Sequence, residues 1–328
     1  IKDLNIPLSK RVRIIFGTNE ETGSKCMKHY SQIEETPVAG FTPDAQYPII
    51  NGEKGIINCT FKKILKNNHG MRLVKIKGGT APNVVPSYAE AVIDCDESAK
   101  RTICEAAKGF KGLEIEDGSR IIVKVHGVPA HGSTPELGVN AISILIEFLS
   151  NLGFEGSLKD FLCFMNDAIG KETNGKKLGI YIKDEVSGEL TVNLGTIDGD
   201  EDGIEFKLNI RYPVTKKYDD FMGTLLDKMG QAGIESTFIS HKHSLYVNPD
   251  TDYIKKLQKV YAEKTGKEAH LLSIGGGTYA KSLKNIVAFG PIFEGEPDLD
   301  HKPDEYMSID GLIKNVQIIA AAICELAK

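Results

Sequence analysis

The hydrophobic and polar positions along the 328-residue chain change their pattern twice. Residues 1–56 and 247–328 alternate short apolar runs with segments of helical periodicity, which is typical of an α/β structure. Val12–Phe16 is an apolar run of the kind expected for a buried strand of a parallel sheet. Apolar residues at helical spacing predict helices over 251–264 and 309–327. Both ends of the chain are therefore predicted to build one α/β domain.

Residues 57–246 show shorter β-rich runs that alternate with helical segments, which predicts an inserted α+β domain of antiparallel sheet and helices. Two similar runs of strands and helices indicate a doubled, ferredoxin-like subdomain. The Asp- and Gly-rich segment 198–203 lies between two expected strands and predicts a hairpin turn. A calcium loop is the alternative, but the segment lacks the closing glutamate and the spacing of an EF-hand. Strands are expected at about 55–63, 71–76, 88–94, 113–116, 120–126, 190–194, 203–212 and 235–240, and helices at about 97–108, 137–152, 158–168 and 218–232.

Composition narrows the class of protein. The 41% of hydrophobic residues is enough to fill two cores. The sequence contains no run of about 18 apolar residues, which is the length needed to cross a membrane. A net charge of -5 with dispersed lysines argues against a nucleic-acid partner. Six cysteines without a C-x-x-C pair are typical of a reduced, cytoplasmic protein. Because the chain opens at Ile1 without a methionine, we expect it to be the C-terminal part of something longer.

Three distant segments carry candidate chemistry. Glu20 and Glu21 directly follow the apolar run, and an extended backbone would point them in opposite directions, so one can ligate a metal while the other acts as a base. The alternative is a solvated loop or the first turn of a helix, where carboxylates suit the helix dipole. Asp44 lies between two prolines, and His301 lies among carboxylates near the C-terminus. Carboxylates and imidazole together suit zinc or manganese.

Six motifs occur in one order from end to end of the chain: 17–23 (GTNEETG), 41–45 (FTPDA), 51–55 (NGEKG), 129–133 (PAHGS), 275–279 (GGGTY) and 301–305 (HKPDE). In these motifs the sequence resembles the M20 family of metallopeptidases, and most closely its dipeptidase branch, the PepV-like bacterial dipeptidases. The resemblance implies a mixed-sheet α/β/α metallopeptidase catalytic domain, made of residues 1–56 and 247–328. It also implies that residues 57–246 form an inserted lid domain.

The resemblance implies roles for ten residues. Glu20 would be the general base, and Glu21, Asp44 and His301 would ligate a pair of zinc ions, with manganese as the alternative metal. His131 would stabilise the oxyanion of the tetrahedral intermediate. The residues expected to bind substrate, chiefly its free α-carboxylate, are Asn83, Arg211, Gly275, Gly276 and Gly277, the three glycines through backbone N–H groups at the start of a helix. The alternative to these roles is that His301 is an ordinary surface histidine and that His131 is an ordinary residue of a turn.

The sequence departs from the family pattern in one respect. The early His-x-Asp motif and the metal-bridging aspartate that the family uses are not in this chain, so the resemblance implies an incomplete catalytic domain. We therefore expect the chain as printed to fold over much of its length yet to show no dipeptidase activity by itself. The doubled lid suggests a monomer at full length, since the second lid half can take the place that a partner subunit fills in dimeric relatives.

Three functions remain open from the sequence. The first is a metal-dependent dipeptidase that hydrolyses a dipeptide with a free C-terminal carboxylate by a metal-activated water. The second is an aminoacylase-type amidohydrolase of the same family, which would differ in how it holds the N-terminal side of its substrate. The third is a folded remnant that binds without chemistry, for which the absent ligands are the only support.

Overall fold

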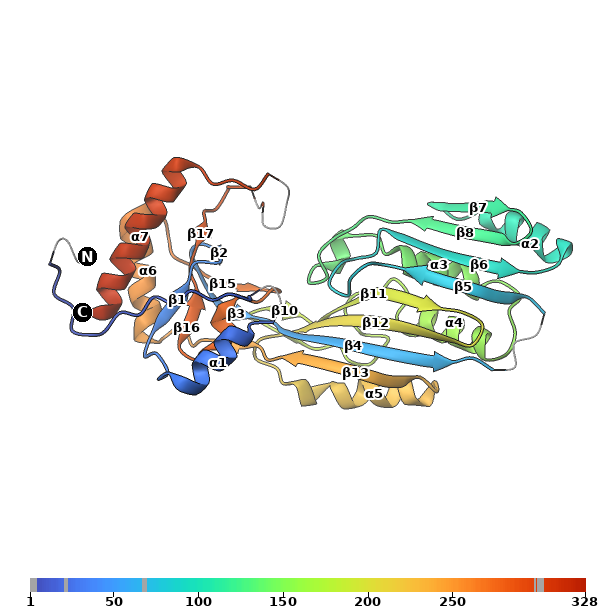
Figure 1. Cartoon of the computed structure of the whole chain (residues 1–328), viewed down its shortest axis with the longest axis horizontal. Coiled ribbons are helices and arrows are strands. Elements are labelled where there is room, and N and C mark those ends of the chain that lie inside the picture. Colours follow the sequence, from blue (N-terminus) through green and yellow to red (C-terminus); the bar gives the residue numbers. More distant parts are fainter. Residues whose placement is uncertain (1–4, 21–22, 67–69, 298, 300–303) are drawn as a thin grey trace. The chain divides into compact units, whose positions relative to one another are not determined.

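The computed structural model describes the chain apart from residues 1–4, 21–22, 67–69, 298 and 300–303. It divides into two compact units (Figure 1). The first unit combines Ile1–Lys54 with Ser244–Lys328, and the second unit is Gly55–His243. The mixed α/β class predicted from the sequence is confirmed, with both parallel and antiparallel strand pairs.

The second unit is built on an eight-stranded antiparallel sheet whose strands lie in the order β13-β4-β12-β11-β5-β6-β8-β7. The strands are β4 (Gly55–Ile64), β5 (Arg72–Gly78), β6 (Tyr88–Asp94), β7 (Leu113–Asp117), β8 (Ile121–His126), β11 (Thr191–Gly199), β12 (Gly203–Tyr212) and β13 (Glu235–Lys242). Its helices are α2 (Glu97–Ala107), α3 (Ala141–Ser150), α4 (Gly156–Ala168) and α5 (Met222–Gln231). Shorter elements are η1 (Pro135–Leu137), η2 (Tyr218–Asp220) and a small hairpin of β9 (Lys183–Asp184) and β10 (Gly188–Glu189).

This sheet consists of two halves with related topology. In one half α5 connects β12 to β13, and β4 lies between them; in the other half α2 connects β6 to β7, and β8 lies between them. Such crossovers over an intervening antiparallel strand are those of a ferredoxin-like subdomain. The halves join where β11 pairs with β5, so each protects an edge of the other.

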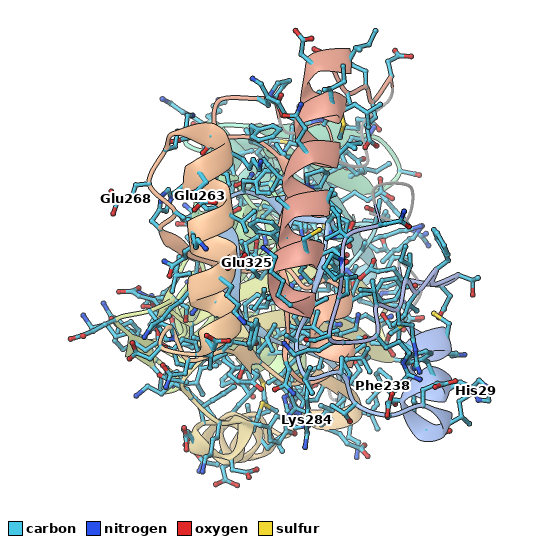
Figure 2. All side chains as sticks on the ribbon, turned by 90° about the vertical axis from the view of Figure 1, so that its left-hand side faces the viewer. His29, Phe238, Glu263, Glu268, Lys284 and Glu325 are labelled. Carbon is cyan, nitrogen blue, oxygen red and sulfur yellow. The ribbon has the colours of Figure 1, made fainter. Side chains whose placement is uncertain are left out.

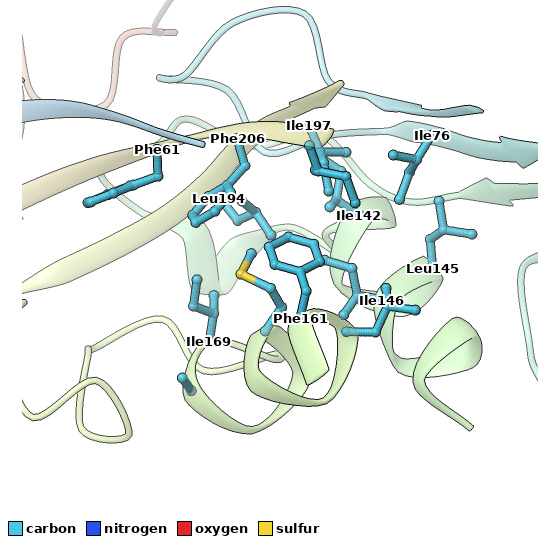
Figure 3. Close-up of a cluster of buried hydrophobic side chains, with 14 of the residues drawn as sticks. Phe61, Ile76, Ile142, Leu145, Ile146, Phe161, Ile169, Leu194, Ile197 and Phe206 are labelled. Atoms are coloured by element: carbon cyan, nitrogen blue, oxygen red, sulfur yellow. The ribbon is translucent and has the colours of Figure 1, made fainter. Parts of the chain in front are cut away.

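Alternation along the strands determines which face of the sheet is covered. In β12 the apolar residues Ile204, Phe206, Leu208 and Ile210 occupy every second position and are fully buried. Figure 3 shows Phe206 pointing from its strand toward Phe161 on α4, and their rings lie 6.0 Å apart. Burying one such aromatic side chain stabilises a fold by about 1.5–3 kcal/mol. The intervening residues of β12 therefore point to the opposite face, away from this core.

The first unit contains a mixed sheet in the order β1-β16-β3-β14, with β15 also paired to β3. Its strands are β1 (Gly40–Thr42), β3 (Ile49–Glu53), β14 (Leu245–Tyr246), β15 (Leu271–Ile274) and β16 (Ile286–Ala288), and a separate parallel pair joins β2 (Ala45–Gln46) to β17 (Pro291–Ile292). Its helices are α1 (Lys25–Ile33), η3 (Tyr279–Ser282), α6 (Asp252–Thr265) and α7 (Ile309–Ala327). Figure 2 shows α6 and α7 side by side, and Lys259 of α6 bonds Glu325 of α7 at 3.0 Å.

One local prediction for the first unit is wrong, and the helix predicted after the three glycines is a short 3₁₀ helix. Residues Val12–Phe16 form no strand, and Phe16 is 88% exposed, because no described residue offers this segment a paired backbone. The three glycines after β15 lead into the four-residue 3₁₀ helix η3 and not into an α-helix. The residue pattern of Val12–Phe16 suits a strand, but a strand exists only where a neighbour accepts its backbone hydrogen bonds.

Among the described residues, no helix is long and apolar enough to cross a membrane.

Candidate functional site

Glu20, the predicted general base, lies in a tight turn just before α1. The turn closes through a hydrogen bond from the backbone N–H of Gly23 to the carbonyl of Glu20, at 3.2 Å, and the Glu20 residue is half-buried. Next to it, the side-chain oxygen of Asn19 accepts from the N–H of Cys26 at 3.2 Å, which satisfies a free donor in the first turn of the helix. Glu20 therefore stands at a fixed turn. Its neighbour Glu21, a predicted metal ligand, lies outside the described residues.

Tyr279 of η3 holds this turn from the other side. Its phenol oxygen accepts from the N–H of Asn19 at 3.3 Å and lies 3.3 Å from the sulfur of Cys26. The hydrogen bond with Tyr279 is the main reason that the pKa of the Cys26 thiol is lowered to about 7. A Cβ atom at Gly17 would lie 2.1 Å from the same phenol oxygen, so any larger residue there would displace the Tyr279 ring. The charge of Glu20 contributes to raising the pKa of Tyr279, after the hydrogen bond to Cys26 and burial, which places the carboxylate close to this ring.

Asp44, the second predicted metal ligand, is exposed in the short link between β1 and β2. Two backbone hydrogen bonds join this link to the residues just after β16. Phe289 N–H donates to Thr42 O at 2.9 Å, and Ala45 N–H donates to Gly290 O at 2.7 Å. The negative charge of Asp44 is among the influences that raise the pKa of Glu53. The two carboxyl groups therefore lie within electrostatic reach of each other in the first unit.

Glu53 carries no prediction from the sequence beyond its place in the 51–55 motif, yet it occupies the centre of this region. Its side chain is fully buried at the end of β3 and accepts two hydrogen bonds from Thr278, from the N–H at 3.1 Å and from Oγ1 at 2.7 Å. Burial raises the pKa of the carboxyl group, while the charge of Lys281 opposes that shift. Lys281 in turn donates to the carbonyl of Lys54. Glu53 thus ties β3 to the start of η3.

The glycine segment between β15 and η3 is held by this network. Its last member, Gly277, directly precedes Thr278, whose Oγ1 also accepts from the N–H of Ala280 at 3.1 Å. The helix that follows Gly275, Gly276 and Gly277 is the single 3₁₀ turn η3, so its dipole would favour a substrate carboxylate less than that of a long α-helix. The segment remains a candidate contact through its backbone alone.

In the second unit, the structure brings Asn83 and His131 together. Asn83 is exposed in a turn that closes from Val84 N–H to Ala81 O at 3.3 Å. Its backbone carbonyl accepts from the N–H of Gly132 at 2.7 Å, and Val84 forms a β-bridge with His131. The predicted substrate-binding residue Asn83 and the predicted oxyanion stabiliser His131 therefore lie in neighbouring loops, although they are about 50 positions apart in the sequence.

The hydrogen bonds of His131 define its tautomer. The backbone N–H of Ser133 donates to Nδ1 at 3.3 Å, and the Ser133 hydroxyl lies 2.6 Å from the same atom. Since Nδ1 accepts, the neutral ring carries its hydrogen on Nε2. The exposed imidazole therefore presents a donor at Nε2, which is the form needed to stabilise a developing oxyanion.

Arg211 is a buried cation on β12, 4% exposed, on the face opposite the aromatic core. Its Nε donates to Oδ1 of Asn209 at 2.8 Å, and the Nδ2 of Asn209 donates to Asn58 at 2.7 Å. Burial lowers the pKa of the guanidinium to about 10, so it keeps its charge at neutral pH. The hydrogen bonds through Asn58 and Asn209 thereby orient the Arg211 guanidinium group, whose paired N–H donors suit a carboxylate.

The predicted metal ligands are only partly placed. Asp44 is described, whereas Glu21 and His301 lie outside the described residues. Among the described residues there is no group of three histidine, cysteine, aspartate or glutamate side chains arranged to hold a metal ion. The predicted metal site consequently stays a prediction. The candidate residues form two sets, one around Glu20, Asp44 and Glu53 in the first unit and one around His131 in the second unit.

A family model described as Peptidase family M20/M25/M40 matches residues 1–325. The chain belongs to this peptidase family. It is therefore a hydrolase that acts on peptide bonds, and the resemblance in its six motifs is confirmed.

Relatives and solved structures agree with that assignment. The M20 chain is 41% identical over 338 residues to "Putative dipeptidase YtjP" of Bacillus subtilis, covering 100% of this chain and 72% of that protein, and 31% identical to "Putative dipeptidase SH1171" of Staphylococcus haemolyticus, covering 99% and 72%. Its fold is similar to that of aminopeptidase PepT from Bacillus cereus, with a TM-score of 0.54, 16% identity, and coverage of 100% of this chain and 67% of that one. The aminoacylhistidine dipeptidase from Vibrio alginolyticus gives a TM-score of 0.53 at 13% identity, with coverage of 95% and 70%.

Proposed function

We propose that the protein is a metal-dependent dipeptidase that hydrolyses the peptide bond of a dipeptide with a free C-terminal carboxylate. The observation that carries the proposal is the preorganised set in the second unit: a His131 ring with its donor on Nε2, beside Asn83, and the buried Arg211 cation held by Asn209. The names of the two bacterial relatives support the same substrate class.

In this mechanism the residues of the second unit bind the substrate. The Arg211 guanidinium and the Asn83 side chain hold the C-terminal carboxylate, and the buried position of Arg211 strengthens that attraction because little water screens it. The Nε2–H of His131 donates to the carbonyl oxygen of the scissile bond as negative charge develops on it. Residues 55–243 would thus act as the lid of the enzyme.

Glu20 supplies the proton transfers. Its carboxylate takes a proton from the attacking water and delivers it to the leaving amine, and the turn closed by Gly23 keeps it in one place. Tyr279 and Asn19 keep that turn from shifting, because both bond the segment next to it. Glu20 is the residue whose loss should affect chemistry most and metal binding least.

We assign the metal to Glu21, Asp44 and His301. The donor set fits zinc or manganese, since it offers carboxylate oxygens and an imidazole. Asp44 is exposed, and its charge reaches the buried Glu53, so a bound cation would relieve the repulsion between the two carboxyl groups. When bound, the metal lowers the pKa of water and polarises the carbonyl group. We also propose a cytoplasmic monomer, because all six cysteines are free thiols and the sheet of the second unit is already doubled.

The test is hydrolysis by the intact gene product of three matched substrates: a dipeptide, the same dipeptide amidated at its C-terminus, and an N-acyl amino acid. We expect turnover of the free dipeptide, loss of activity after chelation, and recovery with zinc or manganese. The Glu20→Gln variant is the control for contaminating peptidases. Preference for the N-acyl amino acid would instead establish the aminoacylase alternative, and turnover that survives chelation would refute the metal-dependent mechanism.

A further inference from the structure

Asn193 of β11 contacts the loop that carries Asn83 at two points. The side chain is 1% exposed, and its Nδ2 donates to the carbonyl of Pro82 at 2.8 Å and to the carbonyl of Val84 at 3.0 Å. These are the two backbone carbonyls on either side of Asn83. One amide group therefore holds both ends of the turn while leaving the Asn83 side chain exposed.

The strand under Asn193 is shaped to receive this loop. The pairing of β11 with β12 shifts register between Leu194 and Thr196, so Gly195 is an extra residue at a bulge. A Cβ atom at Gly195 would lie 2.4 Å from Cα of Pro82, closer than real side chains approach. The loop thus lies directly on the strand backbone, and Asn193 is the side chain that bonds it there.

The same contact reaches His131 through the backbone. Asn83 accepts from Gly132, and a Cβ atom at Gly132 would lie 2.9 Å from the carbonyl carbon of Asn83. Val84, whose carbonyl bonds Asn193, forms the β-bridge with His131. Asn193 is therefore connected to both loops that the proposed mechanism uses, one of them directly and the other through a single residue.

Stability alone does not explain an asparagine at this position. The Oδ1 atom of Asn193 is buried and has no hydrogen-bond partner among the described residues, and a buried acceptor without a partner is unfavourable. Asn193 also lies directly opposite Asn209, the residue that orients Arg211. We infer that Asn193 is a positioning residue that holds the loops of Asn83 and His131 in register with Arg211, an inference that rests on the proposed dipeptidase function.

The test compares Asn193→Asp, which keeps the shape but removes both N–H donors, with Asn151→Asp. Asn151 donates from Nδ2 to the carbonyl of Glu147 at 2.8 Å at the end of α3, so it loses the same kind of bond at a place outside both loops. A second variant, Asn193→Ala, removes the donors without adding charge. In the intact protein, hydrogen exchange is measured at Val85 and Gly132, whose N–H groups bond Ala130 O and Asn83 O.

We expect both Asn193 variants to speed exchange at Val85 and Gly132 by about tenfold or more, while β6 and β8 stay protected and Asn151→Asp changes neither. Dipeptidase kcat/KM should drop by about 10–100-fold, the range typical of residues that orient others. Combining Asn193→Asp with Asn83→Ala should cost less than the product of the two separate losses, because part of the effect of Asn193 acts through Asn83.

Unchanged exchange at Val85 and Gly132, or losses that multiply in the double variant, would overturn the inference. Faster exchange at these amides in a protein whose wild type does not hydrolyse dipeptides would support the loop-holding role and refute the proposed function instead. Loss of protection throughout the second unit in both variants, β6 and β8 included, would show a general structural role and would also overturn the inference.

Discussion

Replacing Thr278 by valine tests the network that ties the first unit together. The change keeps the outline of the side chain but removes its hydroxyl group, which donates to Oε1 of the buried Glu53 at 2.7 Å and accepts from Ala280 N–H at 3.1 Å. The backbone N–H of residue 278 still donates to the other carboxylate oxygen. The variant therefore isolates the contribution of one hydroxyl group at the start of η3.

The magnitude follows from the two lost bonds. A hydrogen bond to a charged group contributes about 1.5–3 kcal/mol, and a neutral one about 0.5–1.5 kcal/mol. Thr278→Val should therefore lower the free energy of unfolding of the first unit by about 2–4.5 kcal/mol. Thr278→Ser is the matched control, since it keeps the hydroxyl group and removes one methyl group, at a cost of about 0.8 kcal/mol.

The loss should depend on pH. The bonds from Thr278 lower the pKa of Glu53 and so act against the upward shift from burial, and removing the hydroxyl group raises the folded-state pKa further. The variant's folded state then binds a proton more readily than the wild type. Its extra destabilisation is present where Glu53 is ionised in the folded state, and it diminishes as pH decreases through the folded-state pKa, which burial holds above the ordinary value of 4.5.

Urea unfolding measures this difference. The chain has no tryptophan, so far-ultraviolet circular dichroism is the appropriate signal, and hydrogen exchange in β3 and β15 assigns the loss to the first unit if the two units unfold separately. Equal stabilities of wild type and Thr278→Val, or a serine variant less stable than the valine variant, would refute the role given to the hydroxyl group. A loss that grows toward low pH would refute the assignment to ionised Glu53.

Four further predictions concern the proposed reaction. Glu20→Gln should lower kcat by orders of magnitude and leave metal content nearly intact in elemental analysis, because an amide cannot accept the proton; the reverse pattern would assign Glu20 to the metal. His131→Ala should reduce kcat with bound metal unchanged, and loss of metal would contradict its assignment to the oxyanion. Arg211→Ala should raise KM for free dipeptides by about 10–100-fold, the loss of one charge-assisted contact, and equal losses on amidated substrates would remove its carboxylate role. Gly17→Ala should displace Tyr279, because its Cβ atom would lie 2.1 Å from the phenol oxygen, and a Cys26 thiol pKa that stays near 7 in a thiol-alkylation titration would argue against that contact.

Local sequence signals predict those elements that are determined within their own length. Helix α2 begins where Asp96 accepts from the N–H of Ala99, and its predicted start at Glu97 is confirmed. The alternation of β12 correctly predicts a strand over 203–212 with one buried face. The hairpin at 198–203 is also confirmed, since β11 and β12 pair across it with Asp200 N–H donating to Gly203 O. The cap of α2 and the turn between β11 and β12 are contacts between residues only a few positions apart.

Elements that depend on distant partners are not determined in this way. The run Val12–Phe16 has the composition of a strand, but pairing requires another backbone, and no described residue pairs with it. The glycine segment after β15 resembles the start of a helix, yet Thr278 bonds Glu53, 225 positions away, and the chain continues as a single 3₁₀ turn. Periodicity within a segment contains no information about such a contact.

The sequence by itself determined the family of this protein, because six motifs of that family occur in order along the chain, and these motifs also supply the candidate site residues. Only the tertiary structure decided which supporting residues hold them. Glu53 and Asn193 lie in ordinary strands, and their importance depends on hydrogen bonds to Thr278, Pro82 and Val84, across separations of about 110 to 225 positions. Burial gives these bonds their strength, since a polar group removed from water must find its partner in the protein.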